Sequence, residues 1–322
     1  MPKEYLHWAL AERAAQRLKK ESHLKAIITQ YTHIYLAGAV IFDTPLYFIF
    51  GQDSQSFQEI SLPLHENNTN SFAPLIRLLR EQQEALKEAM WALIAGIITH
   101  IIADAQFHPM IFYFSGVSTN ENKQRALVRH RTIETALDIA CLTRYAHLNS
   151  LLFGNIIKHK EIDTPAFYWL LSLVYDIPLN QAPLIGKAIT QHCFIQKLFK
   201  KKWLQVLSQA LNYLPGIHFD EIIPLFYSFP HIPHVLLKQN PIHYKHPVTG
   251  TQCLKSIYDM EEDTVIESLK IFSIIDDEWE QQSLIDAFSH LRGPNLTTGM
   301  VGVSTKDMKY FDTQKNLNEF LN

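Results

Sequence analysis

The sequence predicts an all-α protein made of many helices, and three observations point to this class. Several long segments repeat apolar residues three and four positions apart, the spacing of one face of an α-helix. Runs of alternating β-branched residues are scarce, so few strands are expected. Only 11 glycines occur in 322 residues, and 47% of the residues are hydrophobic, enough to bury one large core or two modest ones.

The first half of the chain divides into helices around one turn-rich segment. Amphipathic patterns predict helices over about residues 3–20 and 22–37. Residues 38–70 contain many turn-forming residues and are expected to be mostly loop. Helix resumes near Pro74 and is expected to end at about Phe107, because Pro109 has no backbone N–H to continue the ladder.

The second half shows further helical stretches separated by Pro-containing turns. One helix is expected over about residues 121–152. Shorter helices are expected around Trp169, Leu184, Leu204, Ile222, Ile266 and Ile285. From Pro294 onward the apolar periodicity is lost, so residues 294–322 are expected to form a loosely ordered tail.

Composition excludes several classes. The net charge is -3, and the one tight basic run, Lys200–Lys202, is expected to be a solvated helix face, so no nucleic-acid partner is expected. Cys141, Cys193 and Cys253 are far apart and odd in number, which argues against a disulfide framework or a thiolate zinc site.

No membrane-spanning or export segment is expected. The most apolar stretch, Trp91–Ala103, is too short to span a bilayer and is predicted to be a buried helix. The first residues lack the basic start, apolar stretch and cleavage site of a secretory signal, so a cytoplasmic location is the default expectation.

The most informative motif is a polar stripe on an apolar helix. His100, Asp104 and His108 are four residues apart, and because each helical residue turns by about 100°, they share one face. An unpaired buried carboxylate costs several kcal/mol, and the apolar neighbours provide no cation for Asp104. A divalent metal would supply the missing charge.

Further residues could complete such a site. His130 and Glu134 repeat the four-residue spacing on the next predicted helix, and helical bundles build multinuclear metal sites from facing helices in this way. An ordinary solvated ion pair is the alternative for these two. Upstream, His7, Asp43 and His65 add nitrogen and oxygen donors of the kind that zinc accepts.

These motifs together resemble the zinc-dependent phospholipase C superfamily, which includes the amino-terminal domain of glycosylphosphatidylinositol-specific phospholipase D. The resemblance covers roughly residues 5–140. It rests on the Leu10-Ala11-x-Arg13-Ala14 run after His7, Tyr35–Gly38 leading to Asp43, the loop histidine, His100-x3-Asp104-x3-His108 and His130-x3-Glu134. It implies a helical bundle with a buried multinuclear metal site, similar to phospholipase C and P1 nuclease.

The resemblance also implies how two or three zinc ions are held. Asp43, His65, His100 and Asp104 look like the ligands of a first zinc. His108, His130 and Glu134 look like those of a second. A third would share Asp104, with His7 as the candidate partner.

The implied function is phosphodiester hydrolysis, most naturally of phospholipid head groups, by a metal-bound hydroxide that forms from a water which Asp43 orients or deprotonates. The x3 spacing before His108 looks like the phospholipase D branch, whereas His130-x3-Glu134 looks like the phospholipase C branch, so the bond cleaved stays open. A P1-like nuclease and a non-catalytic protein stabilised by metal are the rivals. Residues 1–153 would form the zinc-binding catalytic core, and residues 154–293 would complete or cover the pocket.

Other motifs have plainer interpretations. The apolar run Met110–Phe114 could form a rim that contacts a membrane peripherally, although core packing is the favoured explanation. His33 is expected to be structural. Four histidines lie near prolines in the second half and are expected on surface or pocket loops: His231, His234, His243 and His246.

Overall fold

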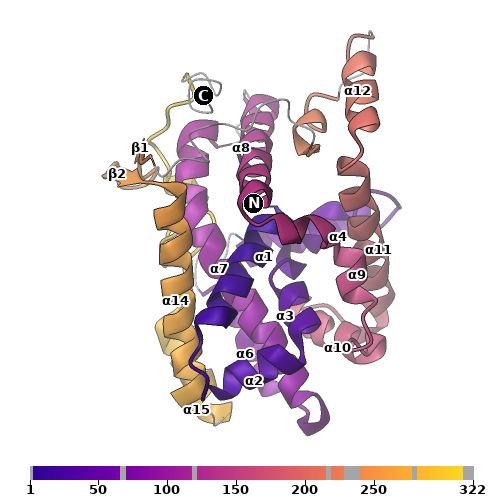
Figure 1. Cartoon of the computed structure of the whole chain (residues 1–322), viewed down its shortest axis with the longest axis vertical. Helices are drawn as coiled ribbons and strands as arrows, with labels where there is room; N and C mark the ends of the chain where they lie inside the picture. The colour runs from indigo at the N-terminus through magenta and orange to yellow at the C-terminus, as the bar shows by residue number, and fades with distance from the viewer. Residues whose placement is uncertain are drawn as a thin grey trace.

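The computed structural model describes residues 3–65, 70–117, 122–214, 219–227, 240–277 and 281–314. These residues are mostly helical, which confirms the predicted all-α class (Figure 1). The helices of the first half are α1 (Glu4–Arg17), α2 (His23–Gln30), α3 (Thr32–Gly38), η1 (Ile41–Tyr47), α4 (Ser54–Glu59), α5 (Ser61–His65), α6 (Ala73–Arg80), η2 (Glu84–Leu86), α7 (Lys87–Ser115), α8 (Lys123–Arg144) and η3 (Ala146–Ser150).

The second half continues with shorter elements. They are α9 (Phe153–Ile157), α10 (Thr164–Tyr175), η4 (Leu179–Gln181), α11 (Ala182–Phe199), α12 (Lys202–Leu211), η5 (Ile223–Leu225), β1 (Ile242–Lys245), β2 (Gln252–Lys255), α14 (Ile257–Asp277), α15 (Gln281–Leu291) and η6 (Thr305–Asp307). The two strands pair antiparallel, with Ile242 opposite Lys255.

Helix α7 runs through the middle of the molecule and organises the core (Figure 1). Helices α1, α2, α3, α8 and α14 pack around it. Every residue from Met90 to Ala105 is buried, as expected of a helix that is apolar on all sides. Residues 84–115 are long and apolar enough to span a membrane, but 72% of their most apolar window is buried inside the protein. The stretch Trp91–Ala103 is therefore a core helix, as predicted.

Pro109 does not end α7, and the predicted boundary at Phe107 is wrong. The helix continues to Ser115, because a proline removes only the one bond that its N–H would donate, here to the Ala105 carbonyl. The chain at Gly299 packs closely over that carbonyl: a Cβ at Gly299 would lie 2.4 Å from the Ala105 oxygen. Met110, Ile111 and Phe114 of this run are buried and belong to the core, whereas Phe112 and Tyr113 are half-buried.

Two other segments differ from their predictions. The helix expected over residues 22–37 is interrupted at Tyr31, whose backbone angles of φ -115° and ψ 42° separate α2 from α3. Residues 38–65 hold more regular structure than the expected loop, because η1, α4 and α5 are short helices. Ile222 precedes a single 3₁₀ turn rather than a helix.

The close crossing of α3 and α7 depends on two glycines. A Cβ at Gly96 would lie 2.1 Å from the Tyr35 carbonyl oxygen, and a Cβ at Gly38 would lie 2.6 Å from the Leu93 carbonyl oxygen. Only glycine permits the two backbones to approach this closely. Because η1 follows directly after α3, this crossing fixes where η1 lies relative to α7.

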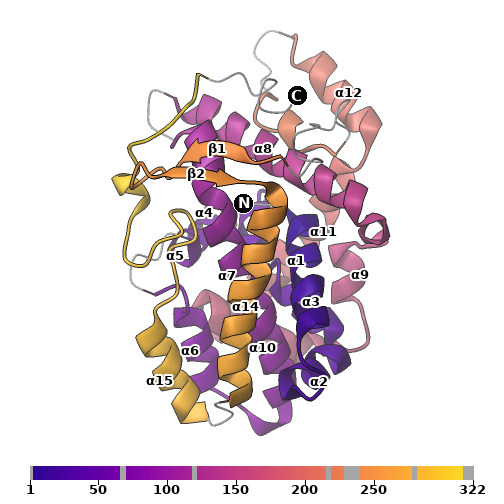
Figure 2. The same ribbon diagram turned by 60° about the vertical axis from the view of Figure 1, so that its left-hand side comes forward.

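The second half of the chain covers the first. In Figure 2, α14 lies along the front of the molecule, with the β1–β2 hairpin at its upper end. Glu261 of α14 is fully buried and pairs with Arg13 of α1 at 2.8 Å and with Arg144 of α8. These ion pairs join three helices around α7.

The remaining predicted features have mixed outcomes. All three cysteines are free, as expected. His243 lies exposed on strand β1 rather than in a loop, and His246 follows the strand. His231 and His234 lie outside the described residues.

Candidate metal centre

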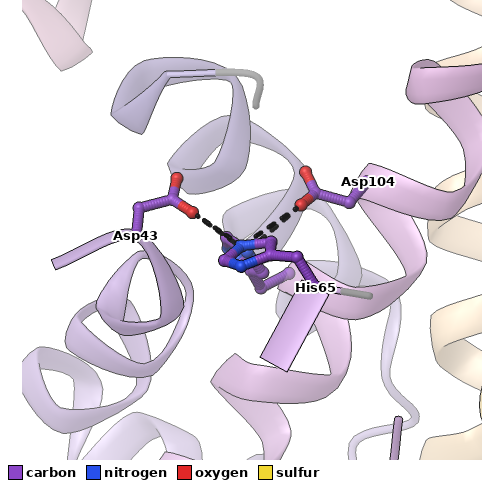
Figure 3. Close-up of side chains that lie close together, drawn as sticks. Asp43, His65 and Asp104 are labelled. Atoms are coloured by element: carbon purple, nitrogen blue, oxygen red, sulfur yellow. Dashed lines mark hydrogen bonds and ion pairs between the residues drawn. The ribbon is translucent and has the colours of Figure 1, made fainter. Parts of the chain in front are cut away.

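Four acidic and imidazole side chains meet at the centre of the molecule. Asp43 comes from η1, His65 from α5, and His100 and Asp104 from α7 (Figure 3). All four are buried, and one ligand atom of each lies within 4.8 Å of the others. We call these four residues the first cluster.

The spacing within the first cluster suits one ion. His65 Nε2 lies 3.2 Å from Asp43 Oδ1, and His100 Nε2 lies 3.5 Å from the same oxygen. His100 Nε2 also lies 3.4 Å from Asp104 Oδ2. Donors that are each about 2.1 Å from a tetrahedral zinc are about 3.4 Å from one another. The facing atoms are thus already separated as ligands of one zinc would be.

The orientation of His100 is set by the α3–α7 crossing. Its Nδ1 donates a hydrogen bond of 2.9 Å to the carbonyl oxygen of Ala39, the residue that ends α3. A carbonyl can only accept, so Nδ1 carries a proton, and Nε2 is the atom that points at Asp43 and Asp104 and can bind a metal when it is deprotonated. A backbone carbonyl that fixes the tautomer in this way is usual behind a metal-binding histidine.

His7 reaches the same place from α1. Its Nε2 lies 3.4 Å from Asp104 Oδ1, and its ring stacks on His100 with centroids 4.2 Å apart. Asp104 therefore has an imidazole facing each carboxylate oxygen. Asp104 thus lies between His7 and His100, and its role as a ligand shared with a third ion stays a prediction.

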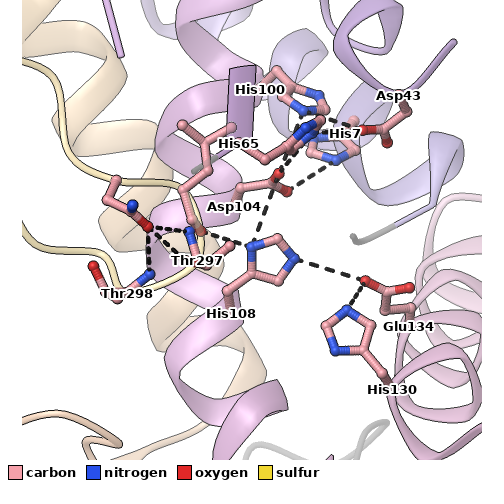
Figure 4. Close-up of polar contacts among 12 residues, drawn as sticks. His7, Asp43, His65, His100, Asp104, His108, His130, Glu134, Thr297 and Thr298 are labelled. Carbon is pink, nitrogen blue, oxygen red and sulfur yellow. Dashed lines mark hydrogen bonds and ion pairs between the residues drawn. The ribbon is translucent and has the colours of Figure 1, made fainter. Parts of the chain in front are cut away.

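Three further predicted residues form a second cluster next to the first. His108 of α7 faces His130 and Glu134 of α8, and the three side chains converge (Figure 4). Glu134 Oε1 lies 2.8 Å from His130 Nε2 and 3.7 Å from His108 Nε2. His108 Nδ1 lies 4.0 Å from Asp104 Oδ2, so the two clusters adjoin. All eight predicted residues are brought together in one buried region.

The segment after α15 supports both clusters, which corrects the expectation of a loose tail from residue 294. Asn295 and Leu296 are fully buried. The Leu296 carbonyl accepts a 2.6 Å hydrogen bond from His108 Nδ1, and the Leu296 N–H donates one of 3.3 Å to the His65 carbonyl. One residue thereby fixes a histidine of each cluster.

The sequence contained no signal for this contact. The groups that orient the two histidines of α7 are main-chain carbonyls, at Ala39 and Leu296, and any residue type supplies a carbonyl. The one local hint is Asn295, whose side chain accepts hydrogen bonds from the N–H groups of Thr297 and Thr298 and so closes a tight turn.

The buried charges shift the acid–base equilibria of the clusters. Burial by itself would raise the pKa of Asp104, but the imidazoles of His108 and His100 outweigh it and hold this pKa well below its usual range. Burial opposes protonation of His100, yet Asp104 and Asp43 raise its pKa to about 9. Burial lowers the pKa of His108 to about 4 and that of His130 well below its ordinary value. The second cluster therefore presents neutral imidazoles, the form that binds metal.

The donor atoms fit zinc on a direct structural test. Both oxygens of Asp104 and the Nε2 atoms of His7, His100 and His108 are buried without a hydrogen-bond partner in the described part of the chain. Leaving buried polar atoms unpaired costs about 1–3 kcal/mol each, more for a charge. A metal ion bound between these unpaired atoms would explain why so many of them lie at one point. Imidazole nitrogens and carboxylate oxygens are ligands that zinc accepts.

A third histidine-containing group lies apart from these clusters. His33, His159 and Glu161 are half-buried, and His33 Nδ1 lies 2.8 Å from the Glu161 carboxylate. The two rings stack at 3.5 Å. In two stacked parallel rings the nitrogen lone pairs lie in parallel planes, so they do not point at one common ion. The hydrogen bond and the stacking explain this group without a metal, and the structural role expected for His33 stays a prediction.

Comparison with known proteins gives one match. Residues 6–178 match the family described as zinc dependent phospholipase C. Neither the curated proteins nor the solved structures include a significant match. The matched residues contain both clusters and make up more than half of the chain, whereas the supporting residue Leu296 lies outside them. The chain belongs to the zinc-dependent phospholipase C family.

Proposed function

We propose that the protein is a zinc-dependent hydrolase of phosphodiesters that releases the head group of phospholipids, cleaving on the glycerol side as a phospholipase C does. One observation carries this: the two adjoining ligand clusters, with Asp104 facing both, in a chain of this family. The proposed ligands are Asp43, His65, His100 and Asp104 for one ion and His108, His130 and Glu134 for another. His7 would join Asp104 at a third.

When bound, the zinc ions supply positive charge that holds the phosphate and lowers the pKa of water to near 7. The residues of the protein hold the ions in position. Asp43, Asp104 and Glu134 contribute three carboxylates to neutralise the ions, and the hydrogen bonds of His100 and His108 to main-chain carbonyls keep the rings in position.

Asp43 has a second proposed role. It lies on η1 at the edge of the first cluster, with 5% of its surface exposed, whereas Asp104 has none. Burial would raise the pKa of Asp43, but His100 outweighs it and lowers this pKa, so the carboxylate is ionised at neutral pH. In this position it can accept a hydrogen bond from the attacking water and orient it towards phosphorus.

The surroundings of the second cluster are apolar. The Phe112 ring lies 4.9 Å from that of His130 and 5.6 Å from that of His108. Phe112 is half-buried, so part of it reaches the surface beside the ligands. This ring can contact the hydrocarbon portion of a bound phospholipid, and a nucleobase could also stack on it.

The test is product analysis from mixed phospholipids. The zinc-loaded protein should release diacylglycerol and a phosphorylated head group, and a chelator should stop the reaction. Phosphatidic acid as the product would assign the phospholipase D reaction instead, and cleavage of single-stranded nucleic acid without lipid turnover would assign the nuclease rival.

A pair of histidine variants provides the matched control. His130→Ala removes a proposed ligand and should abolish turnover, whereas His147→Ala removes a histidine whose side chain is 63% exposed and should leave it unchanged. Tight binding of one zinc without turnover of any phosphodiester would support a purely structural role for the metal and refute the proposal.

A further inference from the structure

Helix α12 has an apolar face that the described chain does not cover. Trp203, Val206 and Leu207 are 64%, 54% and 45% exposed. Together with exposed Ala210 they occupy positions i, i+3, i+4 and i+7, so they form one stripe along the helix. We call these four residues the α12 stripe. Isolated exposed apolar side chains are ordinary, but a contiguous stripe with a tryptophan is not.

The opposite side of α12 packs against the protein, so the helix that carries the stripe is held in place. Leu204 packs against a small core formed by Ile195, Phe199 and Phe226, which is separate from the main core. Gln205 is buried as well. The helix is therefore held by one side and presents the other to solvent.

The chain from Ile177 to the end of α12 is basic, and the first carboxylates after it are Asp220, which accepts a hydrogen bond from Asn212 at the end of α12, and Glu221. From Ile177 to Phe219 the sequence contains five lysines and no aspartate or glutamate. Lys201 and Lys202, at the start of α12, are exposed. This excess contrasts with the whole chain, whose net charge is -3. An apolar stripe bordered by lysines is the pattern of a helix that lies in the interface of an anionic membrane.

The position of α12 relates it to the metal centre. Both views show α12 projecting from the same end of the molecule at which α8 begins (Figures 1 and 2). Arg131, next to His130 on α8, donates a 2.7 Å hydrogen bond to the Glu221 carbonyl in the segment that follows α12. The 3₁₀ turn η5 in this segment packs against both α8 and α12.

We infer that α12 is a membrane-docking helix: its stripe enters the interfacial region of a phospholipid surface while Lys201 and Lys202 contact anionic head groups. The inference rests on the proposed function in one respect, since a phospholipid substrate gives the docking its purpose. A bilayer is favoured over a protein partner because two exposed lysines stand at the start of a helix whose exposed face is apolar and carries a tryptophan. A layer of anionic head groups above hydrocarbon can contact both the lysines and the apolar face.

The test measures vesicle binding with a chelator present, so that hydrolysis does not enter. Wild-type protein should co-sediment with vesicles of phosphatidylcholine and phosphatidylglycerol, and more weakly with phosphatidylcholine alone or at high salt. The double variant Trp203→Gln/Val206→Gln should bind at least about tenfold more weakly, because two apolar side chains no longer leave water. Lys201→Glu/Lys202→Glu should weaken binding by roughly thirtyfold or more.

Two controls match these changes. Leu254→Gln alters a residue of β2 whose exposed fraction, 55%, is similar to the 54% of Val206, and this variant should bind vesicles normally. Lys19→Glu/Lys20→Glu reverses two exposed charges just after α1 and should also bind normally. Fluorescence gives a second readout when wild type is compared with the Trp203→Gln/Val206→Gln variant: of the five tryptophans, Trp8 and Trp91 are fully buried and Trp169 is half-buried, and the most exposed one among the described residues is Trp203. Its emission should shift to the blue on vesicle addition.

The outcomes separate this inference from the proposed function. Normal vesicle binding by the stripe variant, or equal loss in the Leu254 control, overturns the inference. If wild-type protein dimerises and the stripe variant is monomeric with unchanged vesicle binding, the stripe is an interface between copies instead. A short-chain soluble phosphodiester tests the metal centre independently: the stripe variant should hydrolyse it at the wild-type rate, and failure of the wild type to do so would count only against the proposed function.

Discussion

Replacing Gly96 by alanine tests how the fold positions the first cluster. A Cβ there would lie 2.1 Å from the Tyr35 carbonyl oxygen, 2.8 Å from Gly38 Cα and 2.9 Å from the Ala39 nitrogen. All three obstacles are main-chain atoms, so no side-chain rotation relieves the clash. Ordinary contact begins at 3.4 Å, so α3 must move away from α7 by about 1.3 Å, the difference between 3.4 and 2.1 Å.

The expected cost follows from that displacement. Overpacking a buried site costs about 1–3 kcal/mol, and we expect the upper end because backbone must move. For a protein of 322 residues the melting temperature should fall by roughly 4 °C. The shift also pulls the Ala39 carbonyl away from His100, whose Nδ1 now lies 2.9 Å from it, so zinc bound at the first cluster should be lost or weakened.

The assay combines thermal unfolding, followed by circular dichroism, with zinc content of the purified protein. Gly154→Ala in α9 is the matched control, since its Cβ would meet Cys193 at 3.5 Å, an ordinary contact. That variant should be unchanged or slightly more stable, as alanine favours helix over glycine by up to about 1 kcal/mol. A Gly96→Ala protein that melts with the wild type and keeps its zinc would refute the reasoning.

Three further predictions concern charge. Asp104→Asn should weaken zinc binding at the first cluster by at least about a hundredfold and remove turnover, as measured by titration with zinc and by rate; an unchanged zinc affinity there would contradict its role as a ligand. Because the pKa of His100 is raised to about 9, this imidazole is protonated below that pH in the metal-free protein, and zinc must displace the proton. The logarithm of the apparent zinc affinity should therefore rise by about one per pH unit from pH 7 to 9 and then level off. Calorimetry in buffers of different ionisation enthalpy should show that about one proton is released on zinc binding, and release of no proton would contradict the assignment. Glu261→Ala leaves Arg13 and Arg144 without their buried partner and should lower the free energy of unfolding by about 3 kcal/mol in denaturant titrations, with zinc content unchanged; a loss below about 1 kcal/mol would show that the ion pairs contribute little.

The row of polar residues on α7 was predictable from the sequence because helix geometry alone defines it. Four-residue spacing places His100, Asp104 and His108 on one face of any straight helix, and the structure has all three on α7. The same spacing put His130 and Glu134 on one face of α8. Periodic apolar sequence identified these two long helices, although Pro109 was tolerated inside α7 because neighbouring chain packs over the freed carbonyl.

The remaining ligands could not be placed by periodicity. Asp43 and His65 lie on short elements, η1 and α5, whose positions depend on the α3–α7 crossing and on packing between distant segments. Their convergence was expected only from the resemblance to the family. Leu296 escaped notice for a further reason, because its contribution is made by main-chain atoms that no side-chain pattern marks.

The α12 stripe illustrates a different limit. Apolar residues at helical spacing predict a helix around Leu204, and α12 is there. The same spacing is found on helices that face a core and on helices that face solvent, so the sequence did not separate Trp203 from a core residue. Only the structure distinguishes the anchored side of this helix from its exposed side.

The central claim is that the buried imidazoles and carboxylates hold more than one zinc ion. Anomalous diffraction at the zinc absorption edge from crystals of the zinc-loaded protein tests it most directly. We predict one peak among Asp43, His65, His100 and Asp104 and another among His108, His130 and Glu134. A single peak, whether at one cluster or elsewhere, or no peak at either cluster would contradict the account.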